Sequence, residues 1–288
     1  MDILIVGCGD TGRRLAELHR NAGDGVTVTS RSTERCALLA EDGFTSRQLD
    51  LDNVNADQPI AAEVVYLLAP PGGSGGHDPR THNLLQWLDT GTLPRRFVYI
   101  STTGVYGDCQ GDWVTENRPR NPHSQRASRR AAAEQQLEIW AQQRGVALVI
   151  LRVPGIYGPG RLPLDRLQRG DPIIRESEAP WSNRIHIDDL ASATHLAGSL
   201  TQVEAIYNVS DGQPTSMTDY FNRLADTLGL PRPPQVSRAE AEQQLSASML
   251  SFLNESRRID NRRLLESLGL QLRYPDLTTG LKSCLPVA

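Results

Sequence analysis

The sequence predicts a doubly wound α/β fold, in which helices cover both faces of a parallel sheet and a smaller C-terminal lobe stands beside it. Three observations predict this fold. Short apolar runs without alternation, such as residues 3–6 and 64–68, are typical of parallel strands that are buried on both faces. Segments with helical spacing alternate with such runs along the first half of the chain. A glycine-rich turn connects the first run to the first helical segment.

This turn has the spacing Gly-x-Gly-x-x-Gly, at Gly7, Gly9 and Gly12. Gly7 would let the chain turn sharply, Gly9 would let the backbone approach a diphosphate, and Gly12 would let the helix pack close to the strand. The helix begins with Asp10 and Thr11 and directs unpaired N–H groups and its positive dipole end toward the diphosphate. A tight turn without a ligand is the alternative, but the position between a strand and a helix favours a dinucleotide. These five residues are the first candidates for cofactor binding.

The other elements follow from the same alternation. Gly23 is expected to end the first helix and Gly145 a long alanine-rich one, because glycine adopts the left-handed conformation that ends helices. The Pro- and Gly-rich segment 70–76 cannot continue regular structure and is predicted as a loop. Further strands are predicted at residues 26–29, 44–49, 64–68, 96–100, 146–151 and 205–209, and helices at 33–40, 81–89, 126–143, 188–200 and from a cap at Thr215 or Ser216 to residue 228.

The amino-acid composition changes after Pro154, because residues 155–181 are rich in proline, glycine and arginine. We therefore expect two units, each entered twice by the chain. Residues 1–153 with 186–211 are predicted to form a Rossmann-type dinucleotide-binding domain, and residues 154–185 with 212–288 the lobe on the substrate side. Two further helices are expected after residue 231, one of them ending at Gly269.

Composition and charge exclude several classes of protein. The chain has 288 residues and a formal net charge of −4, so nothing favours a nucleic-acid partner. No apolar run approaches the roughly 20 residues that span a bilayer. The N-terminus enters the first strand directly, so we expect no signal peptide and a cytoplasmic location. The four cysteines show no Cys-x-x-Cys or Cys/His spacing, which predicts a reduced protein without a metal site.

The end of the second predicted strand indicates which dinucleotide is bound. NAD sites of this kind place an acid there to hold the ribose 2′-hydroxyl. This chain instead has Arg31 between two serines, with Arg35 one helical turn further on. An arginine can hold a 2′-phosphate bidentately, so NADP is expected rather than NAD, with an ordinary surface arginine as the alternative. Asp50, after the third strand, is expected to meet the adenine, and Ala69, after the fourth, is assigned to the same site.

Three further motifs follow the glycine turn in order: Ser-Thr-Thr-Gly-Val-Tyr-Gly at residues 101–107, Leu-Arg-Val-Pro-Gly-Ile-Tyr-Gly-Pro-Gly at 151–160, and Arg-Ile-His-Ile-Asp-Asp at 184–189. With that turn, they resemble the NAD(P)-dependent epimerase/dehydratase family, the extended branch of the short-chain dehydrogenases/reductases, over nearly the whole chain. The resemblance implies that Thr102 hydrogen-bonds a substrate oxygen undergoing redox change and that Pro154 packs beside the nicotinamide. It also makes a homodimer an expectation, because helix-mediated dimers are common in that family.

The chain departs from this family at the Tyr-x-x-x-Lys pair that transfers the proton. The matching positions hold Arg126 and Arg130, and no tyrosine lies between Tyr106 and Tyr157. A guanidinium does not give up its proton near neutral pH, so Arg126 cannot be an ordinary general acid. Arg130 is expected to hold the nicotinamide ribose in place of the lysine. Tyr106 is the nearest phenol and therefore the candidate proton donor.

Two functions remain open. The first is an NADP-dependent oxidoreductase or epimerase for a small polar substrate, with a nucleotide sugar as one candidate. Arg161 and Arg184 are then expected to bind an anionic group of that substrate. The basic segment 256–261 is a further candidate to line the same cleft, with a solvated helix start as the alternative. The second function is that of a non-catalytic NADP-binding protein that reports redox state to a partner, which the loss of the tyrosine and lysine favours.

Overall fold

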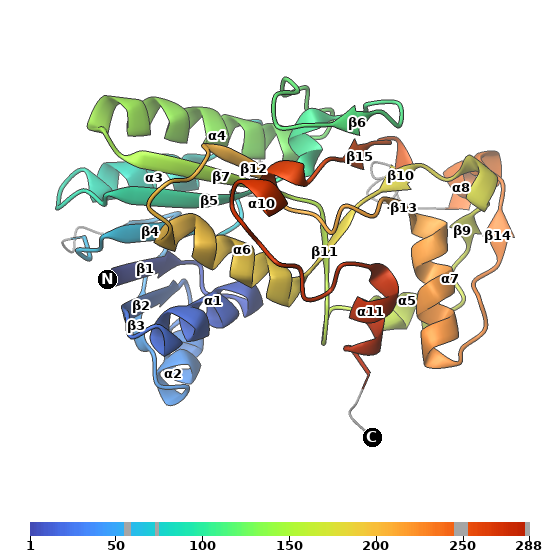
Figure 1. The fold of residues 1–288 in the computed structure, drawn as a ribbon, viewed down its shortest axis with the longest axis horizontal. Helices are drawn as coiled ribbons and strands as arrows, with labels where there is room; N and C mark the ends of the chain where they lie inside the picture. The colour runs from blue at the N-terminus through green and yellow to red at the C-terminus, as the bar shows by residue number, and fades with distance from the viewer. Residues whose placement is uncertain (55–58, 73–74, 245–252, 286–288) are drawn as a thin grey trace.

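The computed structural model describes residues 1–54, 59–72, 75–244 and 253–285. Its centre is a seven-stranded sheet, parallel throughout, in the order β12-β7-β5-β4-β1-β2-β3 (Figure 1). The strands are β1 (Asp2–Val6), β2 (Gly25–Ser30), β3 (Thr45–Gln48), β4 (Val64–Leu67), β5 (Arg96–Thr102), β7 (Ala147–Val153) and β12 (Ile206–Asn208). The predicted fold class is confirmed. The strand order reverses between β1 and β4, and ligands of such sheets bind beyond the carboxyl ends of the strands at that point.

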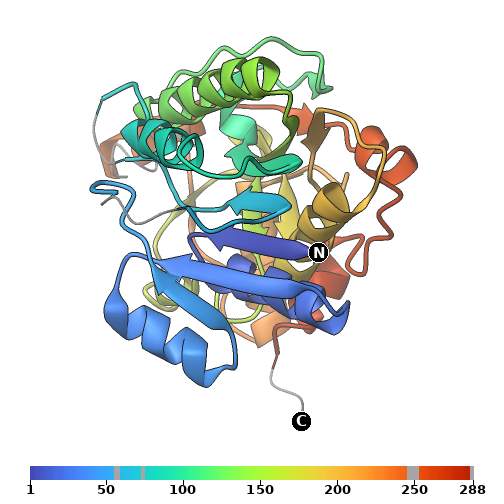
Figure 2. The same ribbon diagram turned by 90° about the vertical axis from the view of Figure 1, so that its left-hand side faces the viewer.

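Helices cover both faces of the sheet (Figure 2). One face carries α1 (Asp10–Asn21), α2 (Thr33–Glu41) and α6 (Ile187–Ser199), and the other carries α3 (Pro79–Leu88) and α4 (Gln125–Arg144). A hydrophobic core lies on each face of the sheet, and successive residues of β1 point into opposite cores. Ile5 packs into the core under α1, α2 and α6, and Val6 into the core under α3 and α4. Burial on both faces explains why the central strands β1 and β4 are continuous apolar runs. α3 begins two residues earlier than predicted because the side chain of Asp78 accepts a hydrogen bond from the backbone of Arg80 and caps the helix.

The smaller lobe is built from short elements (Figure 1). Its two-stranded ladders pair β8 (Gly155–Tyr157) with β11 (Arg184–His186), β9 (Ile173–Ile174) with β14 (Gln235–Val236), and β10 (Trp181–Ser182) with β13 (Thr215–Ser216). β6 (Trp113–Val114) pairs with β15 (Arg258–Ile259) at the junction with the sheet domain. The remaining helices and helical turns are η1 (Thr103–Tyr106), α5 (Leu164–Gln168), η2 (Glu176–Glu178), α7 (Met217–Leu228), α8 (Arg238–Gln244), α10 (Arg262–Glu266) and α11 (Leu277–Lys282). The described helices are each too short or too polar to cross a bilayer.

The C-terminal segment differs from the two helices predicted for it. Its described residues hold α8, α10 and α11, while residues 245–252 lie outside the described part of the chain. α10 ends at Glu266 rather than at Gly269. Leu264 and Leu268 pack into the core beside α6, so a segment assigned to the lobe from the sequence lies against the sheet domain. Of the loop predicted at 70–76, residues 73 and 74 also lie outside the described part.

A buried ion pair joins α4 to the sheet behind the ends of β5 and β7. Glu134 is fully buried and accepts hydrogen bonds from Arg152 at 2.7 and 3.2 Å and from the hydroxyl of Ser101 at 2.5 Å. Arg152 is 3% exposed. Arg120 approaches the same carboxylate from the loop before α4, at 3.2 Å. The network fixes α4 relative to the two strand ends that carry the motifs at residues 101–107 and 151–160.

We expect Glu134→Gln to lower the free energy of unfolding by about 3–5 kcal/mol, because it leaves the buried guanidinium of Arg152 without its countercharge. Urea denaturation measures this loss. Glu138→Gln is the matched control, since Glu138 pairs with Arg120 at 3.0 Å but its side chain is 37% exposed. Its expected loss is below about 1 kcal/mol. Equal losses in the two variants would contradict the importance of the buried pair.

Candidate functional site

The glycine turn is shaped by the close approach of β1 to the end of β4. Gly7 has φ +87°, and a Cβ atom there would lie 2.6 Å from the backbone nitrogen of Ala69, so only glycine fits. A Cβ on Gly12 would lie 3.5 Å from Cγ2 of Ile5, which shows how closely α1 packs on β1. A Cβ on Gly9 would meet nothing within 4 Å. Gly9 also begins α1 without a side-chain cap, so the first N–H groups of the helix are available to an anion.

A cavity of about 440 Å³, here called the nucleotide cavity, lies against this turn. It occupies the switch point of the sheet, where ligands of doubly wound folds bind. The structure brings six residues assigned to the cofactor from the sequence into its lining: Gly7, Gly9, Arg31, Arg35, Asp50 and Ala69. Their contact with a dinucleotide stays a prediction.

Arg80 also lines the nucleotide cavity, and sequence reasoning missed it. Its guanidinium donates to both carboxylate oxygens of Asp52, at 2.7 and 2.5 Å, and these hydrogen bonds lower the pKa of the Asp52 carboxyl. A guanidinium nitrogen of Arg31 lies 4.0 Å from the same carboxylate, and the Arg31 side chain is 69% exposed. Asp50 accepts a hydrogen bond from the backbone nitrogen of Asp52 at 3.0 Å, so its carboxylate also shapes the turn after β3. Arg31, like the exposed Arg35 that also lines the cavity, therefore stays accessible beside it.

Asp10 and Thr11 are not among the described residues that line the nucleotide cavity. The carboxylate of Asp10 accepts hydrogen bonds from Arg14, one turn along α1, and from Arg161 of the smaller lobe, both at 3.3 Å. Arg161 was expected to bind substrate, and the structure shows its charge already paired with Asp10. This ion pair connects the start of α1 to the lobe.

A second cavity, of about 240 Å³ and here called the central cleft, lies beyond the carboxyl ends of β5 and β7. Thr102 ends β5 and Pro154 follows β7, and both line the cleft together with Arg126 and Arg184. Thr102 Oγ1 accepts a hydrogen bond from the backbone nitrogen of Gly104 at 3.1 Å. Because that bond uses a lone pair, the hydroxyl proton of Thr102 is left to donate to another oxygen.

Tyr106 does not reach the central cleft, contrary to the sequence-based expectation. It is 1% exposed, and its hydroxyl donates to Oδ1 of Asn208 at 2.7 Å. The guanidinium of Arg152 lies 4.8 Å from the centre of its ring. Burial raises the pKa of the Tyr106 phenol to about 12. A phenol held in the core with a raised pKa is not placed to exchange a proton with a substrate, so Tyr106 is a core residue that fastens η1 to β12.

Arg130 is held by the end of β5. Its Nη1 donates to the carbonyl oxygen of Ile100 at 2.8 Å and to the hydroxyl of Tyr99 at 3.1 Å. Among the described residues, Arg126 lines the central cleft, whereas Arg130 lines neither that cleft nor the nucleotide cavity. Arg130, at the position of the family's lysine, is thus a cation held against the end of β5. Its contact with a ribose stays a prediction.

The guanidinium of Arg184 is buried without a carboxylate partner. Arg184 is 7% exposed, and its Nη2 contacts the sulfur of Met217 at 3.3 Å. Its guanidinium carbon lies 4.0 Å from the centre of the Tyr220 ring, and its Nε has no hydrogen-bond partner. Within the described part of the chain, no carboxylate oxygen lies within 4.0 Å of its nitrogens. Burying a cation without a countercharge is costly, so this site favours an anionic ligand.

The lining of the central cleft also includes residues that sequence reasoning missed, namely Asn183, Glu255 and Trp181. Glu255 forms an ion pair with Arg257 at 2.7 Å. Asn183 donates to the carbonyl oxygen of Arg257 at 3.0 Å and accepts from the backbone nitrogen of Ile259 at 2.8 Å. Of the basic segment 256–261, Arg257 therefore reaches the cleft. These contacts join parts of the chain that are far apart in sequence, which no local pattern reveals.

Asp211 is a buried carboxyl close to Arg184. It is 5% exposed, and its backbone nitrogen donates to the carbonyl oxygen of Arg184 at 2.9 Å. Burial raises the pKa of its carboxyl to about 7, although the backbone N–H of Gln213 and the charge of Arg184 oppose the shift. At neutral pH the carboxyl is therefore divided between its neutral and ionised forms.

We expect Gly9→Ala to keep the fold and to weaken dinucleotide binding at least about tenfold, which corresponds to 1.4 kcal/mol. The added methyl group would enter the open space that the diphosphate is expected to occupy. Titration of NADPH followed by fluorescence measures the effect, with the melting temperature as a check on folding. Gly76→Ala is the control, because a Cβ there also meets nothing within 4 Å and Gly76 is not in the cavity lining. Undiminished binding by Gly9→Ala would show that the diphosphate lies elsewhere.

A second prediction concerns pH. The raised pKa of Asp211 means that the folded state holds a proton which the unfolded chain releases near pH 4. The contribution of Asp211 to the free energy of unfolding is therefore greatest below pH 4, where both states are protonated. It is lost as the pH rises to about 7, because only the unfolded chain releases its proton in that range. Relative to wild type, Asp211→Asn should therefore gain stability between pH 4 and pH 7, by up to about 4 kcal/mol. Chemical denaturation across this range measures the difference. The exposed Asp226, paired with Arg232 at 2.8 Å, is the control, and Asp226→Asn should show no such rise.

Comparisons with known proteins agree with this geometry. A family model described as the NAD dependent epimerase/dehydratase family matches residues 3–210. Protein YeeZ of Escherichia coli strain K12 is 28% identical over 284 residues, which cover 95% of this chain and 96% of that protein. A conserved protein of unknown function from Silicibacter pomeroyi has a similar structure, with a TM-score of 0.83, 29% identity and coverage of 99% and 98% of the two chains.

Enzymes with solved structures share the fold at lower identity. UDP-glucose 4-epimerase of Thermotoga maritima, solved with UDP-glucose, has a TM-score of 0.77 and 20% identity over 99% of this chain and 97% of that one. UDP-glucuronic acid 4-epimerase of Bacillus cereus, solved with NAD, has a TM-score of 0.76 and 19% identity over 98% and 95%. The family model spans most of the chain, from β1 to beyond β12. This chain therefore belongs to the NAD dependent epimerase/dehydratase family.

Proposed function

We propose that this protein is an NADP-dependent oxidoreductase or epimerase that acts on an anionic substrate in the central cleft. The observation that carries the proposal is the composition of that cleft. Thr102 and Pro154, at the ends of two sheet strands, line it together with Arg184 of the lobe, whose guanidinium has no carboxylate partner among the described residues and whose Nε has no hydrogen-bond partner. A hydroxyl donor for a reacting oxygen and a cation for a remote anionic group thus share one cavity.

The residues around the nucleotide cavity fit a dinucleotide. The open first turn of α1 would receive the diphosphate, and Gly7 and Gly9 leave the backbone free to approach it. Arg31 and Arg35 would hold a 2′-phosphate, since no carboxylate occupies the end of β2. When bound, the dinucleotide supplies a hydride donor or acceptor, and Pro154 would border its nicotinamide.

In the proposed mechanism, Thr102 donates its hydroxyl proton to a hydrogen bond with the reacting substrate oxygen. Arg126 occupies the position of the family's tyrosine and supplies positive charge to an oxygen that develops negative charge. It does not release its own proton near neutral pH. No phenol, imidazole or thiol is found among the described residues that line the cleft. The carboxylate of Glu255 also lines the cleft but is paired with Arg257 at 2.7 Å, so the proposal has the transferred proton exchanged with water in the cleft.

The names of the structural neighbours suggest a class of substrate. The Thermotoga maritima neighbour is named for UDP-glucose, and a diphosphate is a group that the Arg184 site would accept. A nucleotide sugar is therefore the candidate that arises from similarity. It stays a proposal, because the enzymes so named share 20% identity or less with this chain in the comparisons given above.

The alternative is a protein that binds NADP and reports its redox state without turnover. The observation that favours it is the replacement of the proton-transferring pair by Arg126 and Arg130, together with the burial of Tyr106. Binding alone requires the nucleotide cavity but not the hydroxyl of Thr102. A turnover screen on nucleotide sugars and hydroxy acids, repeated with Thr102→Ala, separates the two functions. Turnover that Thr102→Ala abolishes supports the enzyme, and tight NADPH binding without turnover supports the sensor.

NADPH should bind at least about tenfold more tightly than NADH, a difference of 1.4 kcal/mol. Arg31→Ala should remove most of this preference, because the guanidinium would pair with the 2′-phosphate that NADH lacks. Fluorescence titration with both dinucleotides measures it. Arg47→Ala is the control, since Arg47 is an exposed arginine on the neighbouring β3 and does not line the cavity. Equal affinities in the wild-type protein would contradict the assignment of NADP.

A further inference from the structure

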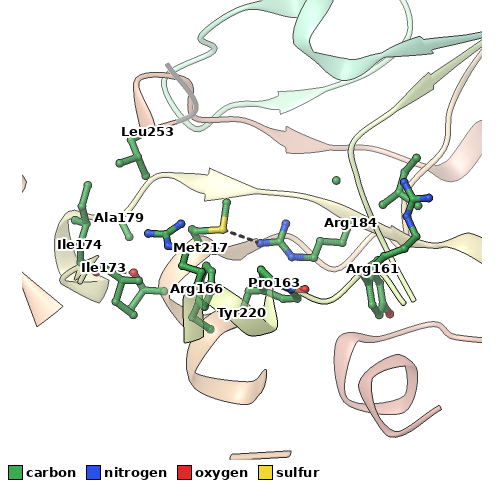
Figure 3. A pocket seen from close by; sticks show the side chains of 15 residues that line it. Arg161, Pro163, Arg166, Ile173, Ile174, Ala179, Arg184, Met217, Tyr220 and Leu253 are labelled. Atoms are coloured by element: carbon green, nitrogen blue, oxygen red, sulfur yellow. Dashed lines mark hydrogen bonds between the residues drawn. The ribbon is translucent and has the colours of Figure 1, made fainter. Parts of the chain in front are cut away.

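The smaller lobe contains a third cavity, of about 400 Å³, here called the apolar cavity (Figure 3). This volume lies within the range of roughly 300–1,000 Å³ found for small-molecule sites. Its wall is formed mainly by apolar side chains, among them Ile156, Ile173, Ile174, Ala179, Phe221 and Leu253. Arg184 and Met217 line both this cavity and the central cleft, so the two adjoin at these side chains.

Two arginines of this cavity lack a counterion. Arg166 resembles Arg184 in its surroundings: its guanidinium carbon lies 4.7 Å from the centre of the Phe221 ring, and its Nε has no hydrogen-bond partner. Its one hydrogen bond among the described residues goes to the carbonyl oxygen of Pro172 at 3.3 Å. In the described chain, neither guanidinium has a carboxylate oxygen within 4.0 Å. Burial lowers the pKa of both groups, as expected for cations whose charge is not compensated.

The other polar groups of the wall do not supply that compensation. Arg161 is neutralised by Asp10, at 3.3 Å. The hydroxyl of Thr218 donates to the carbonyl oxygen of Ile174. Asp211 influences Arg184 only from beyond ion-pairing distance, and its pKa of about 7 leaves part of its population uncharged at neutral pH. No acidic or amide side chain is among the described lining residues.

The lining of the apolar cavity limits which ligands it can bind. A nucleobase carries several hydrogen-bonding groups, and each one buried without a partner costs free energy. The side chains around the apolar cavity offer few such partners. Figure 3 shows Arg184 on one side of Met217, with Ile173, Ile174, Ala179 and Leu253 on the other. A ligand whose anionic group meets Arg184 can therefore extend an apolar body toward these residues.

We propose that the apolar cavity binds an anionic amphiphile, in which a carboxylate or phosphate is held by Arg184, with Arg166 as a further positive charge in the lining, and an apolar chain or ring fills the space lined by Ile174, Ala179 and Leu253. If this amphiphile is the substrate, the proposal rests on the function proposed above. The substrate would then carry an apolar group where a nucleotide sugar carries its nucleotide. Each methylene buried in such a cavity adds affinity in proportion to its area, whereas the anion provides the orientation.

Isothermal titration of the full chain without dinucleotide, at pH 7, tests this proposal with octyl phosphate, octanoate, octanol and UDP. Octyl phosphate or octanoate should bind at least about tenfold more tightly than UDP and than octanol. The two anions together distinguish a phosphate from a carboxylate as the preferred group. Tighter binding of UDP than of both anions would overturn the proposal, and so would octanol binding as well as they do.

Variants test the two halves of the site separately. Arg184→Met should remove the preference for octyl phosphate over octanol, and Arg166→Met should reduce it if Arg184→Met fails to fold. Ala179→Phe, which fills the apolar end, should weaken octyl phosphate while leaving ethyl phosphate unchanged. Arg169→Met is the control, because Arg169 is exposed and paired with Asp171 at 2.7 Å. If Arg169→Met weakens octyl phosphate as much as Arg184→Met does, binding reflects general surface charge and the proposal is wrong.

The same samples separate this proposal from the proposed function. If this protein binds the amphiphile but not NADPH, the apolar cavity is a ligand site and the proposed NADP-dependent function is wrong. Binding of NADPH by a protein that prefers UDP to the amphiphiles would leave the function and overturn the inference.

Discussion

The close contact between β1 and β4 at Gly7 sets the geometry on which the rest of the site depends. The 2.6 Å that would separate a Cβ on Gly7 from the backbone of Ala69 leaves room for hydrogen alone, and the left-handed φ of +87° carries the chain directly into α1. As a result, α1 starts next to the nucleotide cavity, which Gly9 lines, and no side chain caps its first N–H groups. The ends of β2 and β4 border the same space, with Arg31 and Ala69.

The central cleft depends on a different constraint, the fixed relation between α4 and the ends of β5 and β7. The buried pair of Glu134 and Arg152 holds this relation from behind. Its cost is offset by the three donors that surround the carboxylate, from Arg152, Ser101 and Arg120. On the other wall, Arg184 has no such partner. Arg152 is thus a buried cation with a carboxylate partner, as in a structural ion pair, whereas the described residues give Arg184 none, which is why we propose it as an anion site.

The sheet and the nucleotide cavity could be predicted because their signals are local. Continuous apolar strands, glycine spacing and strand-to-helix alternation each occupy a few consecutive residues, and the order of such units limits the topology. Tyr106 was expected in the central cleft because it lies close to Thr102 in sequence, but closeness in sequence does not show which way a side chain points. The helical turn η1 directs the tyrosine into the core, where Oδ1 of Asn208 on a distant strand accepts a hydrogen bond from its hydroxyl. Arg80, Asn183 and Glu255 were missed for the related reason that long-range packing brings them to the cavities.

We expect the crevice above β1 and β4 to hold NADP with its nicotinamide end directed toward Thr102. A crystal structure of the protein grown with NADP⁺ tests it most directly. We expect the diphosphate on the N–H groups at the start of α1, the 2′-phosphate beside Arg31, and the nicotinamide between Pro154 and Thr102. A dinucleotide bound outside this crevice, or one whose 2′-phosphate avoids Arg31 and whose nicotinamide is remote from Thr102, would contradict it.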